Sequence, residues 1–132
     1  MRADYNPYVK NKGTEETEHG LINYTHDMGT VYVTHRRPEH FFKKFRGFGI
    51  SKSELEVCFD KNVFWVMVMY HRKDGTTIPY RVKLSNLRYM DEYDHEGDEQ
   101  VIVPVKEMEQ RIEEGWKKDE TSMQELSSEI KE

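Results

Sequence analysis

The chain has 132 residues, of which 12% are aromatic and 34% charged, so it can bury one modest hydrophobic core but not two. Cys58 is the only cysteine, which excludes an intramolecular disulfide and a zinc site with several cysteine ligands. The formal net charge of −5 is divided unevenly: residues 1–90 hold 15 Lys/Arg and 10 Asp/Glu, and residues 91–132 hold 5 and 15. A basic binding face with an acidic tail, two mutually attracting faces, or a solvated surface with chance clustering of charges would each give this division.

No apolar run reaches the roughly 18–20 residues that a transmembrane helix requires. The longest run, VFWVMVMY at residues 63–70, has the length of a buried strand. The N-terminus also lacks the apolar core of a signal peptide. We therefore expect a cytoplasmic protein with no membrane contact.

The first 45 residues predict an arm followed by a hairpin. Residues 1–20 are polar and show no sustained period, so we expect a flexible N-terminal arm. The β-prone stretches at residues 21–25 and 30–35 are separated by a turn with Gly29, which predicts an antiparallel hairpin. Pro38 ends the second strand because it has no N–H for a strand ladder.

The following segment, EHFFKKFRGFGI at residues 39–50, is ambiguous. Its phenylalanines fit one helical face better than a strand, but Gly47 and Gly49 stop a helix there. We expect a short extended or one-turn element that ends in a glycine-flanked loop.

A short helix is predicted near residues 51–61. Ser51 followed by Glu54 forms a capping box, in which each side chain accepts a hydrogen bond from an N–H of the first turn. Three apolar side chains then follow at i, i+3 and i+4, so they should share one buried face. These three are Leu55, Cys58 and Phe59.

The clearest structural pattern is a hairpin over residues 63–84. VFWVMVMY is apolar on both faces of the pleat, as in a central strand that is covered on each side. An Asp-Gly turn follows, and IPYRVKL then alternates between apolar and polar residues. This alternation directs Arg81 and Lys83 to one side, and Pro79 indicates either that the strand lies near an edge or that this residue points outward.

The C-terminal third is expected to be mainly helical. LSNLRYM predicts one turn of helix, DEYDHEGDEQ an acidic loop and VIVPV a last short strand. Pro104 suits a helix start, and an amphipathic stripe follows at helical spacing. The stripe consists of Val105, Met108, Ile112 and Trp116.

Together these elements predict an α+β fold. We expect a small, mostly antiparallel sheet with the central hairpin 63–84, a short helix near 51–61 and a C-terminal helix from about residue 104. Residues 21–118 would form a single α+β domain, and residues 119–132 a C-terminal helical extension or tail.

The basic segment HRRPEHFFKKFRGFG at residues 35–49 carries most of the functional information. Polyanion binding requires Lys/Arg to displace counterions and aromatic faces on which exposed bases stack, and the segment has both. Alternatively, its phenylalanines belong to the core and its cations are only the solvated side of one element. The first hypothesis is a non-enzymatic small binding module for nucleic acid. Its candidate contacts are Arg36, Arg37, Lys43, Lys44, Arg46, Arg81 and Lys83.

The second hypothesis is a protein-interaction or inhibitor module that binds a basic protein partner through the acidic C-terminal region. Small size, a polar arm and an acidic C-terminal half are typical of accessory proteins of viruses and mobile elements. A helical apolar stripe at the C-terminus either closes the core or forms a homo-oligomer. The candidate interaction residues are Trp116, Met123, Leu126 and Ile130.

An enzymatic function has little support in the sequence. Six histidines are scattered without an H-x3-H pair or an HExxH motif, and the acidic loop does not match an EF-hand. No nucleophile-elbow or phosphate-loop motif occurs, and Cys58 falls on the predicted buried helix face. We expect no catalytic residue, metal or cofactor. A metal-dependent nuclease built from scattered Asp, Glu and His is the remaining catalytic alternative.

Overall fold

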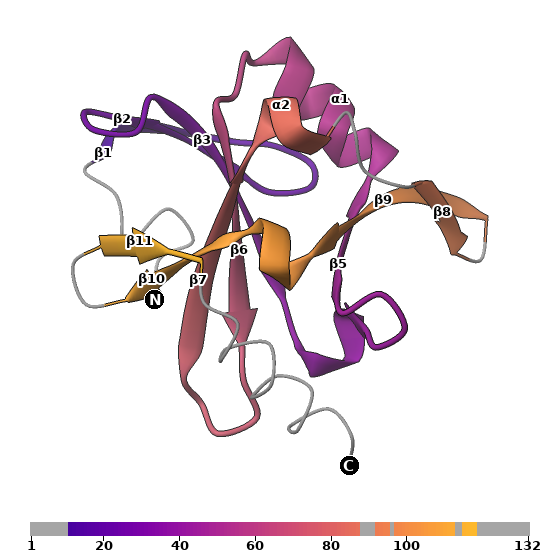
Figure 1. Ribbon diagram of the computed structural model, residues 1–132. Coiled ribbons are helices and arrows are strands. Elements are labelled where there is room, and N and C mark those ends of the chain that lie inside the picture. The colour runs from indigo at the N-terminus through magenta and orange to yellow at the C-terminus, as the bar shows by residue number, and fades with distance from the viewer. Residues whose placement is uncertain (1–10, 88–91, 96, 113–114, 119–132) are drawn as a thin grey trace.

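Two β-sheets dominate the protein, which is known from a computed structural model that describes residues 11–87, 92–95, 97–112 and 115–118. One sheet has seven strands and the other has four (Figure 1). The predicted α+β fold with a C-terminal helix is therefore wrong, because most of the described chain is β-strand.

The seven-stranded sheet is built mainly from neighbouring strands in the chain. In spatial order its strands are β1 (Asn11–Glu16), β2 (Leu21–Thr25), β3 (Thr30–Arg36), β6 (Trp65–His71), β7 (Thr77–Lys83), β10 (Glu109–Ile112) and β11 (Gly115–Lys117). All of its pairs are antiparallel except β3–β6, which is parallel. The chain must therefore leave this sheet after β3 and return to lie beside it.

That excursion supplies half of the four-stranded sheet. Its strands are, in order, β4 (Phe41–Phe42), β5 (Gly47–Ser51), β9 (Asp98–Pro104) and β8 (Glu92–His95). Two α-helices, α1 (Lys52–Asp60) and α2 (Leu84–Leu87), lie together at one end of the sheets, as Figure 1 shows. Two short 3₁₀ turns, η1 (Pro38–His40) and η2 (Val105–Glu107), complete the described helical elements.

The main core lies between the two sheets. Phe48 of β5 packs against Tyr70 of β6 and Tyr80 of β7, with ring centroids 5.3 and 5.9 Å apart. Phe41 lies 5.3 Å from Phe48 in an edge-to-face pair and is also buried. Two of the four phenylalanines in the basic segment are thus core residues. For these two rings, the alternative in which the phenylalanines belong to the core is correct.

A second, smaller apolar cluster lies on the opposite face of the seven-stranded sheet. Its buried members are Met28, Val31, Val33, Met67 and Met69. The partly buried rings of Trp65 and Trp116 pack against it. The strand that was predicted to be covered on both faces, β6, therefore contributes to both clusters.

Several local predictions are confirmed. β2 and β3 form the predicted hairpin, with Gly29 at a φ of 72° in its turn. Helix α1 begins at the predicted capping box, in which Ser51 and Glu54 exchange hydrogen bonds. The hairpin of β6 and β7 has Gly75 at a φ of 91° in its Asp-Gly turn, a conformation that glycine adopts without steric cost. One detail is wrong, because Phe59 is 43% exposed.

The predicted C-terminal helix is replaced by a 3₁₀ turn and the β10–β11 hairpin. Val105 and Met108 enter the main core from η2, while Trp116 packs on the opposite face of the sheet. The apolar residues that were predicted to form one helical stripe therefore belong to two separate apolar clusters. The prediction of an acidic loop is also wrong for residues 92–95 and 98–100, which belong to the hairpin of β8 and β9.

Two expectations about the chain ends receive different answers. Residues 11–16 of the predicted flexible arm form β1, which pairs with β2. Residues 1–10 and 119–132 lie outside the described residues. None of the described helices is long and apolar enough to cross a membrane.

A cation–π contact of Arg81 connects β7 to the β10–β11 hairpin within the seven-stranded sheet. The Arg81 guanidinium lies 3.9 Å from the Trp65 ring centroid and 4.5 Å from that of Trp116. Arg81 also donates a 2.8 Å hydrogen bond to Glu109 from its Nε. β10 pairs with β7 only at two positions, so these side-chain contacts supplement a short ladder.

Replacement of Trp116 by alanine should therefore loosen this hairpin. We expect a loss of about 1–2 kcal/mol in the free energy of unfolding, the range of a partly desolvated cation–π contact. Amide hydrogen exchange in β10 should accelerate more than exchange in β6. Lys117→Ala, at an exposed neighbouring position, is the matched control. Unchanged exchange in β10 of the Trp116 variant would contradict this role.

Candidate functional site

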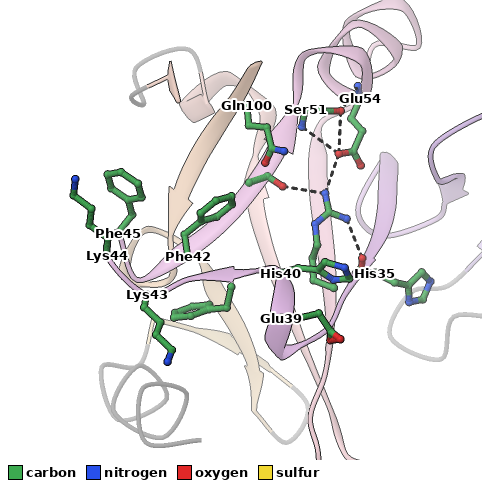
Figure 2. A pocket seen from close by; sticks show the side chains of 13 residues that line it. His35, Glu39, His40, Phe42, Lys43, Lys44, Phe45, Ser51, Glu54 and Gln100 are labelled. Atoms are coloured by element: carbon green, nitrogen blue, oxygen red, sulfur yellow. Dashed lines mark hydrogen bonds and ion pairs between the residues drawn. The ribbon is translucent and has the colours of Figure 1, made fainter. Parts of the chain in front are cut away.

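The described part of the chain contains a groove of about 580 Å³ beside the predicted basic segment. Figure 2 shows Phe42, Lys43, Lys44 and Phe45 on one side, with His35, Glu39, His40, Ser51 and Glu54 on the other. The groove therefore combines aromatic rings, cations and hydrogen-bonding groups.

A tight turn presents the basic side of the groove. The N–H groups of Phe45 and Arg46 donate to the carbonyls of Phe42 and Lys43, which closes the chain between β4 and β5. Arg46 has a φ of 52°, and its carbonyl accepts a hydrogen bond from Val105 in η2. Because both ends of the turn are held by backbone bonds, the side chains of Lys43 and Lys44 are displayed on a fixed loop. Both are exposed.

The two remaining phenylalanines lie in this turn and line the groove. Phe42 and Phe45 are half-buried, and their centroids are 6.5 Å apart with ring planes at 61°. The Lys44 ammonium lies 5.5 Å from the Phe45 centroid. Of the four phenylalanines, two thus belong to the core and two to the surface, which neither sequence interpretation described alone.

Arg36 lies at the groove but is held by a buried hydrogen-bond network. One of its terminal nitrogens donates to Glu54 at 2.8 Å and to the Gly49 carbonyl at 3.0 Å. The other donates to Thr34 at 2.6 Å and to the His35 carbonyl at 2.9 Å. The Arg36 side chain is only 15% exposed, so its charge is committed to the protein's own carboxylate.

Glu54 joins three elements through the same network. Its carboxylate accepts hydrogen bonds from Arg36 of β3, from Ser51 at the start of α1, and from the Tyr32 hydroxyl at 2.5 Å. Burial alone raises the pKa of Glu54, but Arg36, Tyr32 and Ser51 outweigh burial and hold this pKa below its ordinary value. Burial, together with the nearby Glu54 charge, raises the pKa of Tyr32 far above its ordinary value.

The groove extends over the outer face of the four-stranded sheet at Gly49. A Cβ placed on Gly49 would overlap Oε1 of Gln100 and lie 2.9 Å from Cε2 of Phe42. The amide of Gln100 and the ring of Phe42 thus both pack against the backbone at Gly49. A larger residue at position 49 would require the Gln100 side chain to move.

The predicted nucleic-acid contacts are not all in one place. Arg36, Lys43 and Lys44 line the groove, and Arg46 is exposed in the same turn. Arg37 is also exposed, with its Nε 3.6 Å from Glu39. The structure thus brings the five cations of the 36–46 segment to one region, but Glu54 neutralises Arg36.

Arg81 and Lys83 lie elsewhere. Tyr80 points into the main core against Phe48, so its neighbour Arg81 projects from the opposite face of the seven-stranded sheet. Lys83 has the same alternation and lies 5.7 Å from the exposed ring of Phe64. A single continuous surface with the 36–46 segment is therefore not formed.

Of the four predicted interaction residues, Trp116 alone lies within the described part of the chain. Trp116 lies beside Arg81 in the second apolar cluster, so it closes a core rather than extending a helix. Met123, Leu126 and Ile130 lie outside the described residues.

His35 and His71 form a pair at one end of the parallel β3–β6 ladder. His35 Nδ1 and His71 Nε2 are 2.8 Å apart, and His71 Nδ1 lies 3.1 Å from the Thr77 hydroxyl. The ring centroids are 5.0 Å apart and the planes differ by 16°. This centroid distance equals the nitrogen–nitrogen distance plus one ring radius on each side, so the rings lie edge to edge in nearly one plane. Such a pair shares one proton between its facing nitrogens.

Two features that would support catalysis in the described ranges are a group of metal ligands and a reactive thiol. Within them, no three His, Cys, Asp or Glu side chains are grouped so as to hold a metal ion. Cys58 is buried, and burial together with the charge of Glu54 raises the pKa of its thiol to about 12. A thiol with so high a pKa is a poor nucleophile at neutral pH.

Sequence reasoning missed three parts of the site. Ser51 and Glu54 were recognised as a capping box, but the local spacing says nothing about Arg36, which lies far away in the chain. Gln100 was assigned to an acidic loop, and no sequence feature distinguished it. The pairing of His35 with His71 depends on the parallel register of β3 and β6, which local patterns do not reveal.

Comparisons with known proteins give no relative. No protein-family model, curated protein or solved structure matches this chain significantly.

Replacement of Arg36 by alanine should destabilise the fold strongly. Glu54 would then be buried without its cation, which typically costs about 3–5 kcal/mol in the free energy of unfolding. Urea denaturation monitored by tryptophan fluorescence measures this change. In the wild type, the lowered pKa of Glu54 stabilises the fold above the pKa of the unfolded carboxyl, and this stability is lost as the pH falls through the folded pKa.

The control for this substitution is Lys61→Ala, which removes the partly exposed Lys61–Glu15 ion pair at 2.6 Å. Its midpoint should stay close to that of the wild type, because exposed pairs contribute little. Equal midpoints for the Arg36 and Lys61 variants would contradict the structural role of Arg36.

The histidine pair gives a prediction on pH. Burial, with the neighbouring His71 and Arg36, lowers the pKa of His35 below its ordinary value. The unfolded chain therefore binds the proton first, so stability should be full above pH of about 6.5 and should decline as the pH falls through the folded pKa. NMR titration of the imidazole nitrogens measures this directly. In His71→Gln, the pKa of His35 should rise, and a fall would contradict the pairing.

Proposed function

We propose that this protein is a non-enzymatic binding module that contacts nucleic acid through the turn between β4 and β5. One observation carries the proposal: exposed Lys43 and Lys44 lie on a fixed turn beside the half-buried rings of Phe42 and Phe45. Cations release counterions from a phosphate backbone, and aromatic faces accept unstacked bases.

The structure narrows the set of contacts that we propose. Lys43, Lys44 and Arg46 are the central cations, with Arg37 at the margin. Arg36 is assigned a structural role, because release of its guanidinium to a ligand would leave Glu54 buried and unpaired. Arg81 and Lys83 are left out because they lie on the other face of the seven-stranded sheet.

The cytoplasm suits such a module, since its one cysteine is a buried free thiol. No step of this proposal requires a metal or a cofactor. The turn supplies charge and stacking surface, which are sufficient for binding.

Fluorescence anisotropy with a labelled single-stranded oligonucleotide across a salt series tests the proposal. Lys43→Ala combined with Lys44→Ala should weaken binding at low salt. If each lysine neutralises one phosphate, the slope of log affinity against log salt should fall by about 1.4 in magnitude, or about 0.7 per contact.

The control is Lys83→Ala, which removes an equally exposed lysine from the other face of the seven-stranded sheet. Its affinity and slope should equal those of the wild type. Absence of binding by the wild type at low salt, or an unchanged slope in the double variant, refutes the proposal.

A further inference from the structure

We infer that the groove binds an unpaired base of a single-stranded nucleic acid, which stacks on Phe42 and is read along its edge by the amide of Gln100. This inference rests on the proposed function and specifies its ligand. It separates two parts of the binding site: the lysines of the turn, which would contact phosphate, and the groove, which would take the base.

The charge distribution favours a neutral group inside the groove. The guanidinium of Arg36 is neutralised by Glu54 at 2.8 Å, and the carboxylate of Glu39 lies 3.6 Å from Arg37, so neither ion pair leaves a net charge in the lining. The exposed cations Lys43 and Lys44 belong to the turn at its side. A phosphate would therefore be attracted to the turn and not to the interior, whereas a nucleobase carries no charge that the interior would repel.

The groove also has the surfaces that a base requires. Phe42 is half-buried, and it meets the amide of Gln100 above Gly49. Figure 2 shows Gln100 beside Phe42 at the same part of the groove. A base that stacks on this ring directs its polar edge toward the amide, which offers both a donor and an acceptor. The Ser51 hydroxyl provides another polar group in the lining.

The dimensions of the groove leave room for an unpaired base. A volume of about 580 Å³ is in the range of pockets that hold one small molecule. Bases within a duplex are stacked and paired, so their faces cannot reach a ring inside such a groove without being flipped out, which costs energy. Single strands present their bases without this cost.

We therefore expect the groove to give three ligands different affinities, although Lys43 and Lys44 would contact phosphate in all three. A single strand with bases should bind most tightly. A strand of the same length and charge with abasic sites would keep only the phosphate contacts. A duplex would keep these contacts but withhold its base faces.

Competition anisotropy with these three ligands at one salt concentration is the test. For the wild-type protein we expect the abasic strand and the duplex to bind at least about five-fold more weakly, the low end of the contribution of one stacked base. Phe42→Leu should lose this preference and keep the affinity for the abasic strand. Gln100→Leu should change the order of affinities among homopolymers of different bases.

The matched control is Phe59→Leu, which replaces an exposed phenylalanine on α1 that does not line the groove. It should keep the wild-type preference. Thermal unfolding of each variant identifies any loss of fold, and the abasic ligand tests the wild-type protein without any substitution.

Each outcome decides between the two proposals. Equal binding of the normal and abasic strands, with both weakened in the Lys43/Lys44 variant, overturns the base site and leaves the proposed function intact. Retention of the preference by a folded Phe42→Leu variant also overturns it. If no oligonucleotide binds, both proposals fail. Saturable binding of a free mononucleotide at Phe42, seen by NMR, would then show a base site without polymer binding and would redirect the ligand class.

Discussion

The buried ion pair between Arg36 and Glu54 is the interaction on which the arrangement of the protein depends. It connects β3 of the large sheet, β5 of the small sheet and the first turn of α1 through one carboxylate and one guanidinium. Removing both charges from water is costly, and the pair is tolerated because nearly every donor and acceptor around it is satisfied. Arg36, Ser51 and Glu54 of this network also line the groove.

Because of this ion pair, the cations of the basic segment at residues 35–49 do not all have the same role. Its cations appear equivalent in the sequence, but the fold gives them different tasks. Arg36 holds the sheets together, and Lys43 and Lys44 are displayed on a turn that backbone hydrogen bonds fix. The same division applies to the rings, since Phe41 and Phe48 are buried while Phe42 and Phe45 line the groove. Core residues and groove-lining residues therefore alternate within one short stretch.

The sequence predicted those features that depend on neighbouring residues. The hairpin before Arg36, the capping box of Ser51 and Glu54, and the Asp-Gly hairpin all follow from local turn and cap chemistry. The C-terminal helix was wrong because a spacing of three and four residues does not show that Met108 and Trp116 pack on opposite faces of a sheet. The partners of Arg36 and the position of Gln100 depend on long-range pairing, for which no local pattern exists.

The parallel pairing of β3 with β6 has a consequence for how a ligand would act on the protein. The segment between these strands leaves the large sheet, forms most of the lining of the groove and returns beside its own starting point. Closing such a long loop has an entropic cost that is recovered only when the two strands meet. A molecule that occupies the groove recognises only the closed form of this loop, so its binding energy is added to the cooperative stability of the large sheet. Occupancy would therefore also be felt in β6, a strand at the centre of the large sheet that does not line the groove.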